Sequence, residues 1–401
     1  EKKVPALRFR GFDNAWEQHK LGEVATYRRG SFPQPYGKSE WYDGNGAMPF
    51  VQVADVSDEM NLVEDTKQKI SILAQPMSVF VEQNSVLVTL QGSIGRVAIM
   101  QYDAFVDRTV LIFEKYKAEI DKTFWAYIIK QKFIDEARKA PGGTIKTITK
   151  EALSDFDLSI PKYQEQKQIG EYFRNLDHLI SLHQRKLEML KKIKKSMLEK
   201  MFPKNDAKVP ELRFSDFTDA WEQRCLGECF EERNENMPKG ELISVTINDG
   251  VKRFSELGRH DNSNENKSKY KKVCVGDIPY NSMRMWQGAS GYSMYEGIVS
   301  PAYTVLKPKE GVNSRCVSYL FKREDMIHTF QLNSQGITSD NWNLKYPKLS
   351  QIGIFLPLNL REQEKIVECF VKLDHLISLH QRKLEKLKNI KKSMLEKMFI
   401  I

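Results

Sequence analysis

The chain has 401 residues, which is enough for two or three domains. Hydrophobic residues make up 41% of it, so cores can form and wholesale disorder is not expected. The formal net charge of +9, from 62 Lys and Arg against 53 Asp and Glu, favours a polyanionic partner such as nucleic acid, although charge alone also fits a basic protein that binds none.

The five cysteines all lie in the second half of the chain, and no CxxC pair occurs. An odd number without such pairs argues against a disulfide framework and against a four-thiolate zinc site. No apolar run approaches the roughly 18 residues of a membrane-spanning helix. We therefore expect reduced thiols, a cytoplasmic location and no membrane partner.

A short lead-in recurs in the second half of the chain. Residues 4–24 read VPALRFRGFDNAWEQHKLGEV, and residues 209–229 read VPELRFSDFTDAWEQRCLGEC. The two segments match at 13 of 21 positions, with an offset of 205 residues. Internal repeats outrank local patterns as a guide to architecture. The match divides the chain into two related halves.

Residues 1–160, with the lead-in included, are predicted to form one globular domain, the first head. Strand-like runs such as MPFVQVADV and SVLVTL stand beside a helical run, KTFWAYIIKQKFIDEARKA, which is typical of an α/β domain. After a linker at 203–208, a second head is predicted at 209–357. Its sequence is very different, and only a faint echo joins the two, QGSIGRVAI near Gln91 and QGASGYSMY near Gln287.

A long helical tail follows each head, at residues 161–202 and 358–401. Two runs are identical in both tails at an offset of 197, LDHLISLHQRKLE at 176–188 and 373–385, and IKKSMLEKMF at 193–202 and 390–399. Apolar residues recur every three or four positions, so each tail is predicted to be a helix whose narrow stripe packs against a partner helix. The predicted helix-interface residues are Leu176, Ile180, His183, Leu187, Leu190, Ile193, Met197, Leu373, Ile377, His380, Leu384, Leu387, Ile390 and Met394.

Connectivity sets the direction of the two helices. The first helix leaves the first head and ends near the second head, where the second helix begins, so paired stripes require antiparallel helices. About 38 residues at about 1.5 Å each give a rod of about 57 Å. The predicted fold is α/β (α+β), with two heads joined by two long antiparallel coiled-coil helices in a pseudo-two-fold internal repeat.

The lead-ins and helices form a repeated frame around divergent heads. This favours one fixed role for the frame and different targets for the heads; simple duplication with drift is the alternative.

Two features of the helices allow more than one interpretation. Lysines on their other faces, such as Lys191 and Lys192, fit a solvated helix surface, phosphate contacts or the docking of a partner that binds twice. His183 and His380 lie on the apolar stripe. Packed interface histidines are the simplest interpretation of that position.

Motifs for catalysis are missing. The sequence contains no P-loop, no G-x-G-x-x-G after a strand, no HExxH and no GxSxG. It also lacks an Asn-Pro-Pro or Asp-Pro-Pro run followed by an aromatic residue, which an amino-methyltransferase needs to grip its target base. The carboxylates of Asp155 and Asp157 lie in an alternating, strand-like stretch that looks structural. No catalytic residue and no metal ligand is therefore predicted.

The duplicated order of these segments resembles a known family. A lead-in of the form P-x-L-R-F-x-x-F…W-E-x-x-x-L-G-E occurs at 5–23 and 210–228. An I-P-x…E-Q-x-x-I run before a long helix occurs as IPKYQEQKQI at 160–169. The second copy, LPLNLREQEKI at 356–366, has one extra residue before its Glu-Gln pair. Over nearly the whole chain, this order is similar to that of the specificity subunit of type I restriction–modification systems.

The resemblance implies a non-catalytic DNA-recognition subunit of a phage-defence complex. Each head would be a target recognition domain that reads one half of a bipartite, asymmetric site in double-stranded DNA, and the helices would set the unread spacer. Two methyltransferase subunits, which methylate adenine, and two motor-nuclease (restriction) subunits would be the protein partners. This chain would bind no cofactor itself; S-adenosylmethionine, ATP and Mg are implied for the partner subunits.

Loops rich in basic, amide and hydroxyl side chains are the expected DNA contacts, because such groups pair with base edges and phosphates. In the first head these loops are 27–46, 90–98 and 141–150. Their candidate DNA-binding residues are Arg28, Arg29, Gln34, Lys38, Tyr42, Gln91, Ser93, Arg96, Thr144, Lys146 and Thr147.

In the second head the corresponding loops are 252–272, 281–292 and 333–342. Their candidate DNA-binding residues are Lys252, Arg253, Arg259, Asn281, Arg284, Trp286, Gln287, Ser290, Thr338, Asn341 and Trp342. For any one residue, an ordinary place on the surface is the competing interpretation. Two other kinds of protein compete with the DNA-reading subunit: a complete restriction enzyme, against which the missing motifs argue, and a helical scaffold with protein-binding heads.

Overall fold

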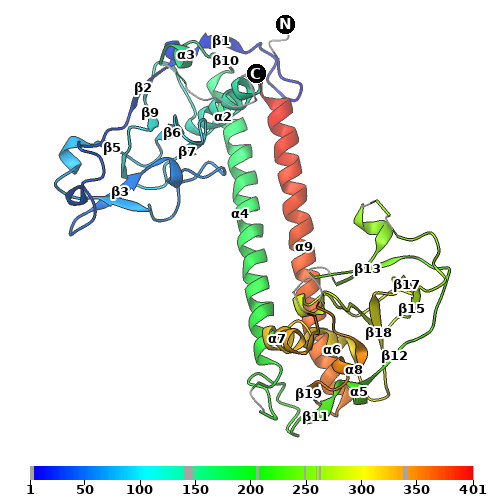
Figure 1. Cartoon of the computed structure of the whole chain (residues 1–401). Coiled ribbons are helices and arrows are strands. Elements are labelled where there is room, and N and C mark those ends of the chain that lie inside the picture. Colours follow the sequence, from blue (N-terminus) through cyan, green and yellow to red (C-terminus); the bar gives the residue numbers. More distant parts are fainter. Residues whose placement is uncertain are drawn as a thin grey trace. The chain divides into compact units, whose positions relative to one another are not determined.

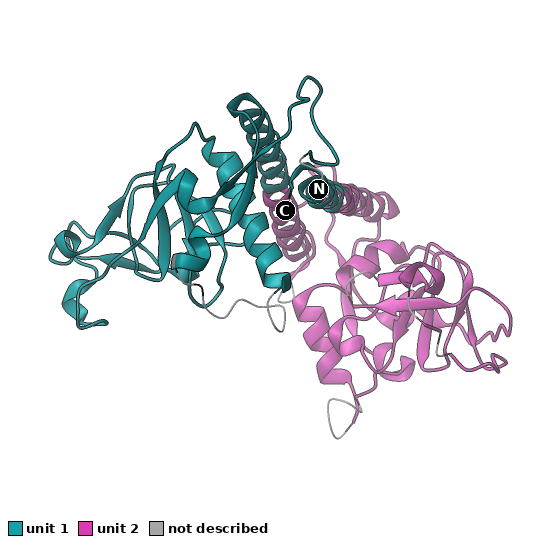
Figure 2. Cartoon of the chain, turned by 90° about the horizontal axis from the view of Figure 1, so that it is seen from above, with its two compact units in different colours: residues 1–183, 383–401 teal, residues 184–382 magenta. Residues whose placement is uncertain are grey.

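The computed structural model describes residues 4–139, 148, 150–204, 207–247, 250–258, 260–261, 263–336 and 342–400. The chain divides into two compact units (Figure 2), residues 1–183 with 383–401, and residues 184–382. Two long helices, α4 (Tyr163–Lys200) and α9 (Leu360–Met398), contribute a segment to each unit. Each unit therefore combines one head with parts of both helices.

The first head is built on an antiparallel sheet with the strand order β2-β9-β6-β7. Its strands are β2 (Ala25–Arg29), β9 (Val110–Tyr116), β6 (Val86–Thr89) and β7 (Val97–Ile99). A second sheet has the order β4-β3-β8-β5, in which β3 and β8 are parallel. Its strands are β3 (Met48–Val51), β4 (Gln68–Ile70), β5 (Val79–Val81) and β8 (Ala104–Val106). Short 3-10 turns lie at Ser39–Trp41, Val53–Asp55 and Gln75–Met77.

The first sheet is covered on both faces, which explains why its strands read as nearly continuous apolar runs. Side chains alternate along a strand, so Leu111 and Phe113 join the core that contains helix α2 (Lys122–Lys139). Val110 and Ile112 point the other way, into the core shared with the second sheet. The layers of the first head are therefore helix, sheet and sheet (Figure 1).

The second head repeats the central sheet on a smaller scale, with the order β12-β18-β16. Its strands are β12 (Phe230–Glu232), β16 (Ile278–Asn281) and β18 (Tyr303–Pro308). Two further antiparallel pairs are β13 (Ile243–Thr246) with β14 (Gly250–Arg253), and β15 (Lys271–Val273) with β17 (Gly297–Val299). Its helices are α6 (Ser314–Leu320), α7 (Glu324–Asn333) and α8 (Tyr346–Leu349), with 3-10 turns η5 (Phe254–Leu257) and η6 (Met285–Gln287).

Each lead-in folds as a strand that pairs with the strand before a long helix. In the first unit β1 (Glu17–Lys20) is antiparallel to β10 (Asp157–Ile160). In the second, β11 (Glu222–Cys225) is antiparallel to β19 (Gly353–Leu356). Short helices follow each lead-in strand, α1 (Leu21–Val24) and α5 (Leu226–Cys229), and α3 (Lys150–Ser154) precedes β10.

A buried glutamate at the start of each long helix fastens the lead-in. Glu165 accepts hydrogen bonds from Arg8, at 2.6 and 2.7 Å, and one from the indole of Trp16 at 3.4 Å. In the second unit Glu362 accepts from Arg213, at 2.8 and 2.9 Å, and from the Trp221 indole at 3.2 Å. Breaking a buried pair of this kind costs about 3–5 kcal/mol. The repeated lead-in is thus a structural fastening.

The glutamine beside each of these glutamates holds a loop. Gln166 accepts a hydrogen bond from the backbone of Asp121 and donates to the carbonyl of Pro161. Gln363 likewise accepts from the backbone of Asn313 and donates to the carbonyl of Pro357. In both halves the two side chains of the Glu-Gln pair are buried and hydrogen-bonded, which explains why the pair is repeated.

The two long helices run antiparallel where they meet in each unit. In the first unit Phe173 of α4 lies 5.8 Å from Phe399 just beyond α9, and Asp177 pairs with Lys391. Residue numbers rise along one helix as they fall along the other. The predicted α/β class, with repeated heads and two antiparallel helices, is confirmed.

The second unit contains the same contacts between the two long helices. There α9 supplies the residues that α4 supplies in the first unit, and α4 supplies those of α9. Phe202 lies 6.3 Å from Phe370, and Lys194 pairs with Asp374 at 2.5 Å. Every one of these residues is the repeat-mate of a residue in the first unit, at an offset of 197. This exchange is the contact pattern that a pseudo-two-fold repeat requires.

Candidate nucleic-acid interface

In the first head, topology gathers the candidate loops at one edge of the central sheet. Strands β2 and β6 are both antiparallel to β9, so both end where β9 begins. Arg28 and Arg29, predicted in loop 27–46, instead form the end of β2, and the rest of that loop follows the strand. Residues 90–96 follow β6, and the three-residue turn 107–109 precedes β9. We call residues 28–36, 90–95 and 107–109 the loop edge of the first head. It brings together segments far apart in sequence.

Most of the predicted contact residues of the first head are exposed. Arg28, Arg29, Gln34, Lys38, Gln91 and Ser93 all face solvent. Arg28 and Arg29 also line a cavity of about 270 Å³ with Leu90 and Ile148. The structure therefore places the arginines of the first loop beside the start of the second.

Four of the predicted residues of the first head are engaged within the protein. Arg28 lies 3.4 Å from the carboxylate of Glu114. Arg96 pairs with Asp58 at 2.7 Å. Tyr42 is half-buried and stacks on Phe32 with ring centroids 5.3 Å apart; burial raises the pKa of its phenol. Lys38 pairs with a neighbouring carboxylate and lies over the Trp41 ring. These side chains shape the loops and would need to exchange partners before contacting DNA.

Two residues of the loop edge were missed by the sequence analysis. Arg108 is exposed in the turn before β9, with its guanidinium 5.4 Å from the ring centre of Tyr36. The hydroxyl of Tyr36 accepts a hydrogen bond from Gln52 at 2.8 Å. The turn escaped notice because it is three residues long and contains neither Gly nor Pro. In the sequence, the turn is indicated only by three polar residues between the apolar runs AFV and VLIF.

The second head arranges its loops in the same way. β12 and β16 are both antiparallel to β18, so loop 281–292 begins at the edge where β12 ends. Trp286 of this loop meets Trp342 edge to face, with ring centroids 5.3 Å apart. The backbone of Leu344 donates to the carbonyl of Ser282 at 2.9 Å. Two of the three predicted loops are thus brought together.

Other predicted residues of the second head differ in exposure. Arg284 is exposed and Asn281 half-buried. Lys252 and Arg253, predicted in loop 252–272, instead lie in strand β14. Arg253 is exposed, 3.6 Å from Glu241, and Lys252 is half-buried. The Oε1 atom of Gln287 is buried, and within the described residues it has no hydrogen-bond partner.

Ser290, a predicted DNA contact, is buried in the structure and not exposed on the loop surface. Its backbone forms a bridge with that of Tyr280, and its buried hydroxyl has no hydrogen-bond partner within the described residues. Six further candidates lie outside the described residues, namely Thr144, Lys146, Thr147, Arg259, Thr338 and Asn341.

A lysine from the neighbouring helices anchors loop 281–292. The Nζ atom of Lys322 donates to the carbonyls of Gly288, at 2.7 Å, and Ser290, at 2.8 Å. Burial, with a smaller contribution from Lys194, lowers the pKa of Lys322 to about 8. Its ammonium group therefore holds the loop from inside the head.

The predicted helix-interface residues are all shielded to some degree. Leu176, Ile180, Leu187 and Leu190 are buried on α4. The remaining ten, His183 and His380 among them, are half-buried. Met394, Ile390 and Leu387 of α9 pack against the core of the first unit, and Met197 and Leu373 pack against that of the second.

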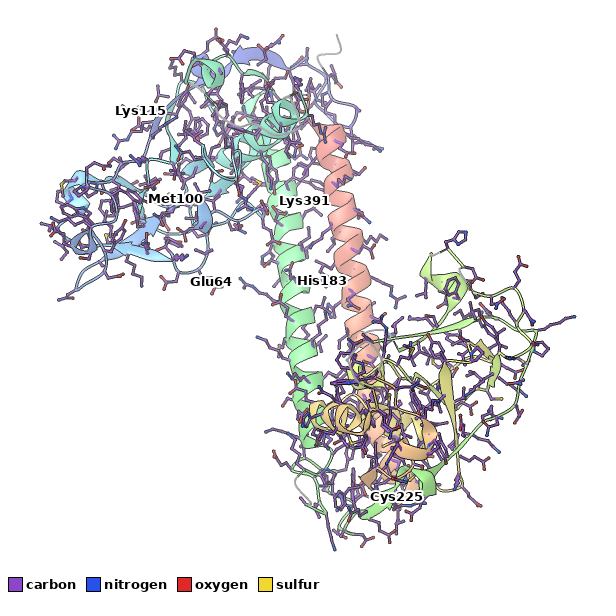
Figure 3. The ribbon with its side chains drawn as sticks, viewed as in Figure 1. Glu64, Met100, Lys115, His183, Cys225 and Lys391 are labelled. Carbon is purple, nitrogen blue, oxygen red and sulfur yellow. The ribbon has the colours of Figure 1, made fainter. Side chains whose placement is uncertain are left out.

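A tyrosine from each head contacts both long helices through a charged pair. The hydroxyl of Tyr127 donates to Asp177 of α4, which also pairs with Lys391 of α9; the Lys391 ammonium lies 5.2 Å from the tyrosine ring centre. Burial raises the pKa of Tyr127, and the Asp177 charge adds to the effect. Figure 3 labels Lys391 on the helix.

The second unit repeats this arrangement. The hydroxyl of Tyr319 donates to Asp374 at 2.8 Å, and Lys194 pairs with the same carboxylate while lying 5.6 Å from the ring centre. We call the two sets, Tyr127–Asp177–Lys391 and Tyr319–Asp374–Lys194, the clamps. Each fixes a head to both helices within its unit.

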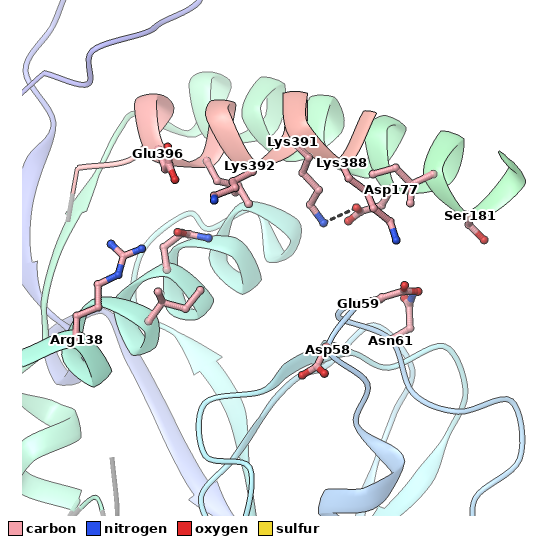
Figure 4. A pocket seen from close by; sticks show the side chains of 14 residues that line it. Asp58, Glu59, Asn61, Arg138, Asp177, Ser181, Lys388, Lys391, Lys392 and Glu396 are labelled. Atoms are coloured by element: carbon pink, nitrogen blue, oxygen red, sulfur yellow. Dashed lines mark hydrogen bonds and ion pairs between the residues drawn. The ribbon is translucent and has the colours of Figure 1, made fainter. Parts of the chain in front are cut away.

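A groove of about 340 Å³ opens beside the first clamp (Figure 4). Its walls come from the loop at Asp58, from α2, and from both long helices. Acidic side chains such as Glu59 and Glu396 face basic ones such as Lys388 and Lys392. The mixed charge does not select one kind of small ligand.

The described residues form neither a metal-binding cluster nor a membrane-spanning helix. No group of three or more His, Cys, Asp and Glu side chains in them is placed to hold a metal ion. No helix formed by them is long and apolar enough to cross a membrane.

Known proteins share this architecture. The chain is 23% identical to the type I restriction enzyme MjaVIII specificity subunit of Methanocaldococcus jannaschii, over 95% of this chain and 91% of that protein. It superposes on the S subunit of a type I restriction–modification system from M. genitalium with a TM-score of 0.63, at 15% identity and 99% coverage of both chains. A chain from a structure describing complex assembly and conformational transition of the type I system gives a TM-score of 0.52, at 12% identity, over 97% of this chain and 98% of that one.

A family model matches both halves separately. The model for the type I restriction modification DNA specificity domain matches residues 14–192 and again residues 218–389. Each match runs from a lead-in strand through a head into a long helix. The chain therefore belongs to the type I restriction modification DNA specificity domain family, with one copy of the domain in each half.

Proposed function

We propose that this chain reads a bipartite, asymmetric DNA sequence for a type I restriction–modification complex, with one half-site for each head. The observation that carries the proposal is the contrast between frame and loops. Both units fasten their heads by the same Arg, Trp and Glu contacts. At matching sheet edges, however, the first head offers Gln91 and the second Asn281 and Arg284. Different polar groups on one frame would read different bases.

The proposal includes partners and a division of labour. Two methyltransferase subunits and two motor-nuclease subunits would bind the chain, with S-adenosylmethionine, ATP and Mg held by those partners. The chain itself would carry no catalytic group. Exposed helix side chains such as Leu179, Leu182 and Met189 offer apolar surface for a partner to cover. A repeated frame favours partners that bind twice in equivalent ways.

Methylation mapping tests the proposal directly. DNA is sequenced for methylated adenine from cells that carry the chain with its methyltransferase partner, and from cells that carry the methyltransferase alone. We expect a two-part motif with a fixed gap that depends on the chain. If no motif depends on it, the chain is not the source of DNA specificity, and a protein-binding scaffold becomes the better explanation.

Loop variants assign the half-sites to the heads. Gln91→Ala with Ser93→Ala is expected to alter one half of the motif, and Asn281→Ala with Arg284→Ala the other half. The two double variants serve as controls for each other, because each removes exposed or half-exposed polar groups from a loop at a matching sheet edge. A change in both halves from either variant would contradict the one-head, one-half-site assignment.

A further inference from the structure

The turn at residues 107–109 lies where three segments of the first head meet. The backbone N–H of Gly30, at the end of β2, donates to the carbonyl of Val110 at 3.0 Å. The N–H of Leu90, at the end of β6, donates to Thr109 at 2.8 Å. Asp107 donates its own N–H to Val51, at the end of β3, at 3.0 Å. One short turn therefore joins both sheets and two of the predicted loops.

This turn is held firmly in place. The carboxylate of Asp107, 1% exposed, accepts a hydrogen bond from the N–H of Thr109 at 2.9 Å. Glycine at position 30 lets the first loop press against the turn, because a Cβ there would lie 2.1 Å from the carbonyl oxygen of Val106. A side chain carried by the turn is consequently presented from a fixed backbone, which specific recognition requires.

Arg108 is the exposed residue of this turn; Asp107 is buried and Thr109 is half-buried. Its guanidinium is oriented by the ring of Tyr36, which is itself held through Gln52. Arg28 and Arg96 each lie near a carboxylate, but within the described residues Arg108 forms no ion pair. The guanidinium of Arg108 is thus held in position while its N–H groups stay available to a ligand.

We propose that Arg108 reads a guanine in the half-site of the first head. The planar guanidinium can donate two parallel hydrogen bonds to the O6 and N7 atoms of guanine in the major groove, a pairing that the other bases do not offer. The cation–π contact with Tyr36 restrains the guanidinium and so lowers the entropy lost on binding. This inference deepens the proposed function and rests on it.

Methylation mapping of substituted chains tests the inference in the intact complex. The variants are Arg108→Ala, which removes the side chain, and Arg108→Lys, which keeps the charge but loses the fork. The matched control is Lys115→Ala, which removes one exposed positive charge from the opposite end of β9. Lys115 is labelled in Figure 3.

Both Arg108 variants are expected to lose discrimination at a single guanine of one half-site, by roughly 5- to 150-fold, the value of one bidentate contact. The other half-site and the spacer should stay as in the wild type, and Lys115→Ala should leave the whole motif unchanged. An unchanged motif in Arg108→Ala, with or without weaker methylation, overturns the inference, because a phosphate contact weakens all sequences alike.

A second measurement covers the case in which Arg108→Ala abolishes methylation. The complex carrying Arg108→Lys is then titrated with duplexes that differ only at each guanine of that half-site. Loss of preference at one position supports the inference, and an equal loss at every position overturns it. If the wild-type chain itself directs no motif, the proposed function fails, and the assignment of Arg108 fails with it.

Discussion

The half-buried ammonium group of Lys322 holds the candidate reading loop of the second head. Its ammonium group donates to two carbonyls of loop 281–292 from inside the head. Loop residues that contact a ligand gain precision when buried neighbours fix them. Lys322 is thus a positioning residue for this loop, which carries the candidate DNA-binding residue Arg284.

The lowered pKa of Lys322 makes stability depend on pH. The folded-state pKa of about 8 lies below the ordinary value of 10.5. Between these values the unfolded chain binds more protons, so the contribution of this group to the free energy of unfolding rises with pH, by at most about 1.4 kcal/mol per unit. Relative to Lys322→Met, the wild type should therefore gain stability from pH 8 to pH 10. Chemical unfolding followed by tryptophan fluorescence measures it.

Lys307→Met is the control for this titration. Lys307 is exposed on β18, and its hydrogen bond with Glu231 raises its pKa, so it titrates above the same window. The stability difference between wild type and Lys307→Met should be flat from pH 8 to pH 10. A flat difference for Lys322→Met as well would show that Lys322 is not shifted downward.

At the scale of elements, the clamps explain how helices with a narrow apolar stripe hold the heads. Each clamp joins a head helix, α4 and α9 through one carboxylate. The side chains of Asp177 and Lys391 are 29% and 17% exposed, so the pair is partly desolvated. An ion pair in that position contributes more to the free energy of unfolding than a fully solvated ion pair does.

Asp177→Asn is expected to lower the free energy of unfolding by about 1–3 kcal/mol, because it leaves Lys391 without its counter-charge while the shape of the side chain is kept. Glu171→Gln, an exposed position on the same helix, should change it by less than about 0.5 kcal/mol. Denaturant unfolding of the three chains measures both values. Equal stability of Asp177→Asn and the wild type would mean that the clamp contributes only packing.

The helices could be predicted from sequence and the strand order could not. The repeats and the apolar stripe carry the helical period, and both are local. The strands of the heads are three to seven residues long and mostly buried, so they lack the alternation that assigns a face. The role of Glu165 also escaped prediction, since its partner Arg8 lies 157 residues away. The burial of Ser290 also escaped prediction, because polar composition suggests a loop but says nothing about which of its side chains are buried.

At the scale of the whole molecule, the two copies of the domain share both helices. α4 and α9 each supply a segment to both units, so neither half of the chain supplies all the contacts of its own head. Phe399, from the end of the chain, packs with Phe124 and Trp16 of the first head. A change in the length of the helices would therefore affect both units, as the proposed role of the helices in setting the DNA spacer requires.

Lengthening both helices in step tests the ruler. Seven residues inserted after His183 in α4 and seven after His380 in α9 preserve the apolar stripe, because the stripe repeats about every 3.5 residues. The insertion adds about 10 Å at about 1.5 Å per residue, which corresponds to about three base pairs of DNA at 3.4 Å each. Methylation mapping should then show both half-sites unchanged and the spacer longer by about three base pairs.

Inserting the residues into one helix alone breaks the register of the pair and should abolish methylation. If the double insertion is active with the original spacer, the helices join the heads without measuring the distance between the half-sites, and that distance must be set by the partner subunits.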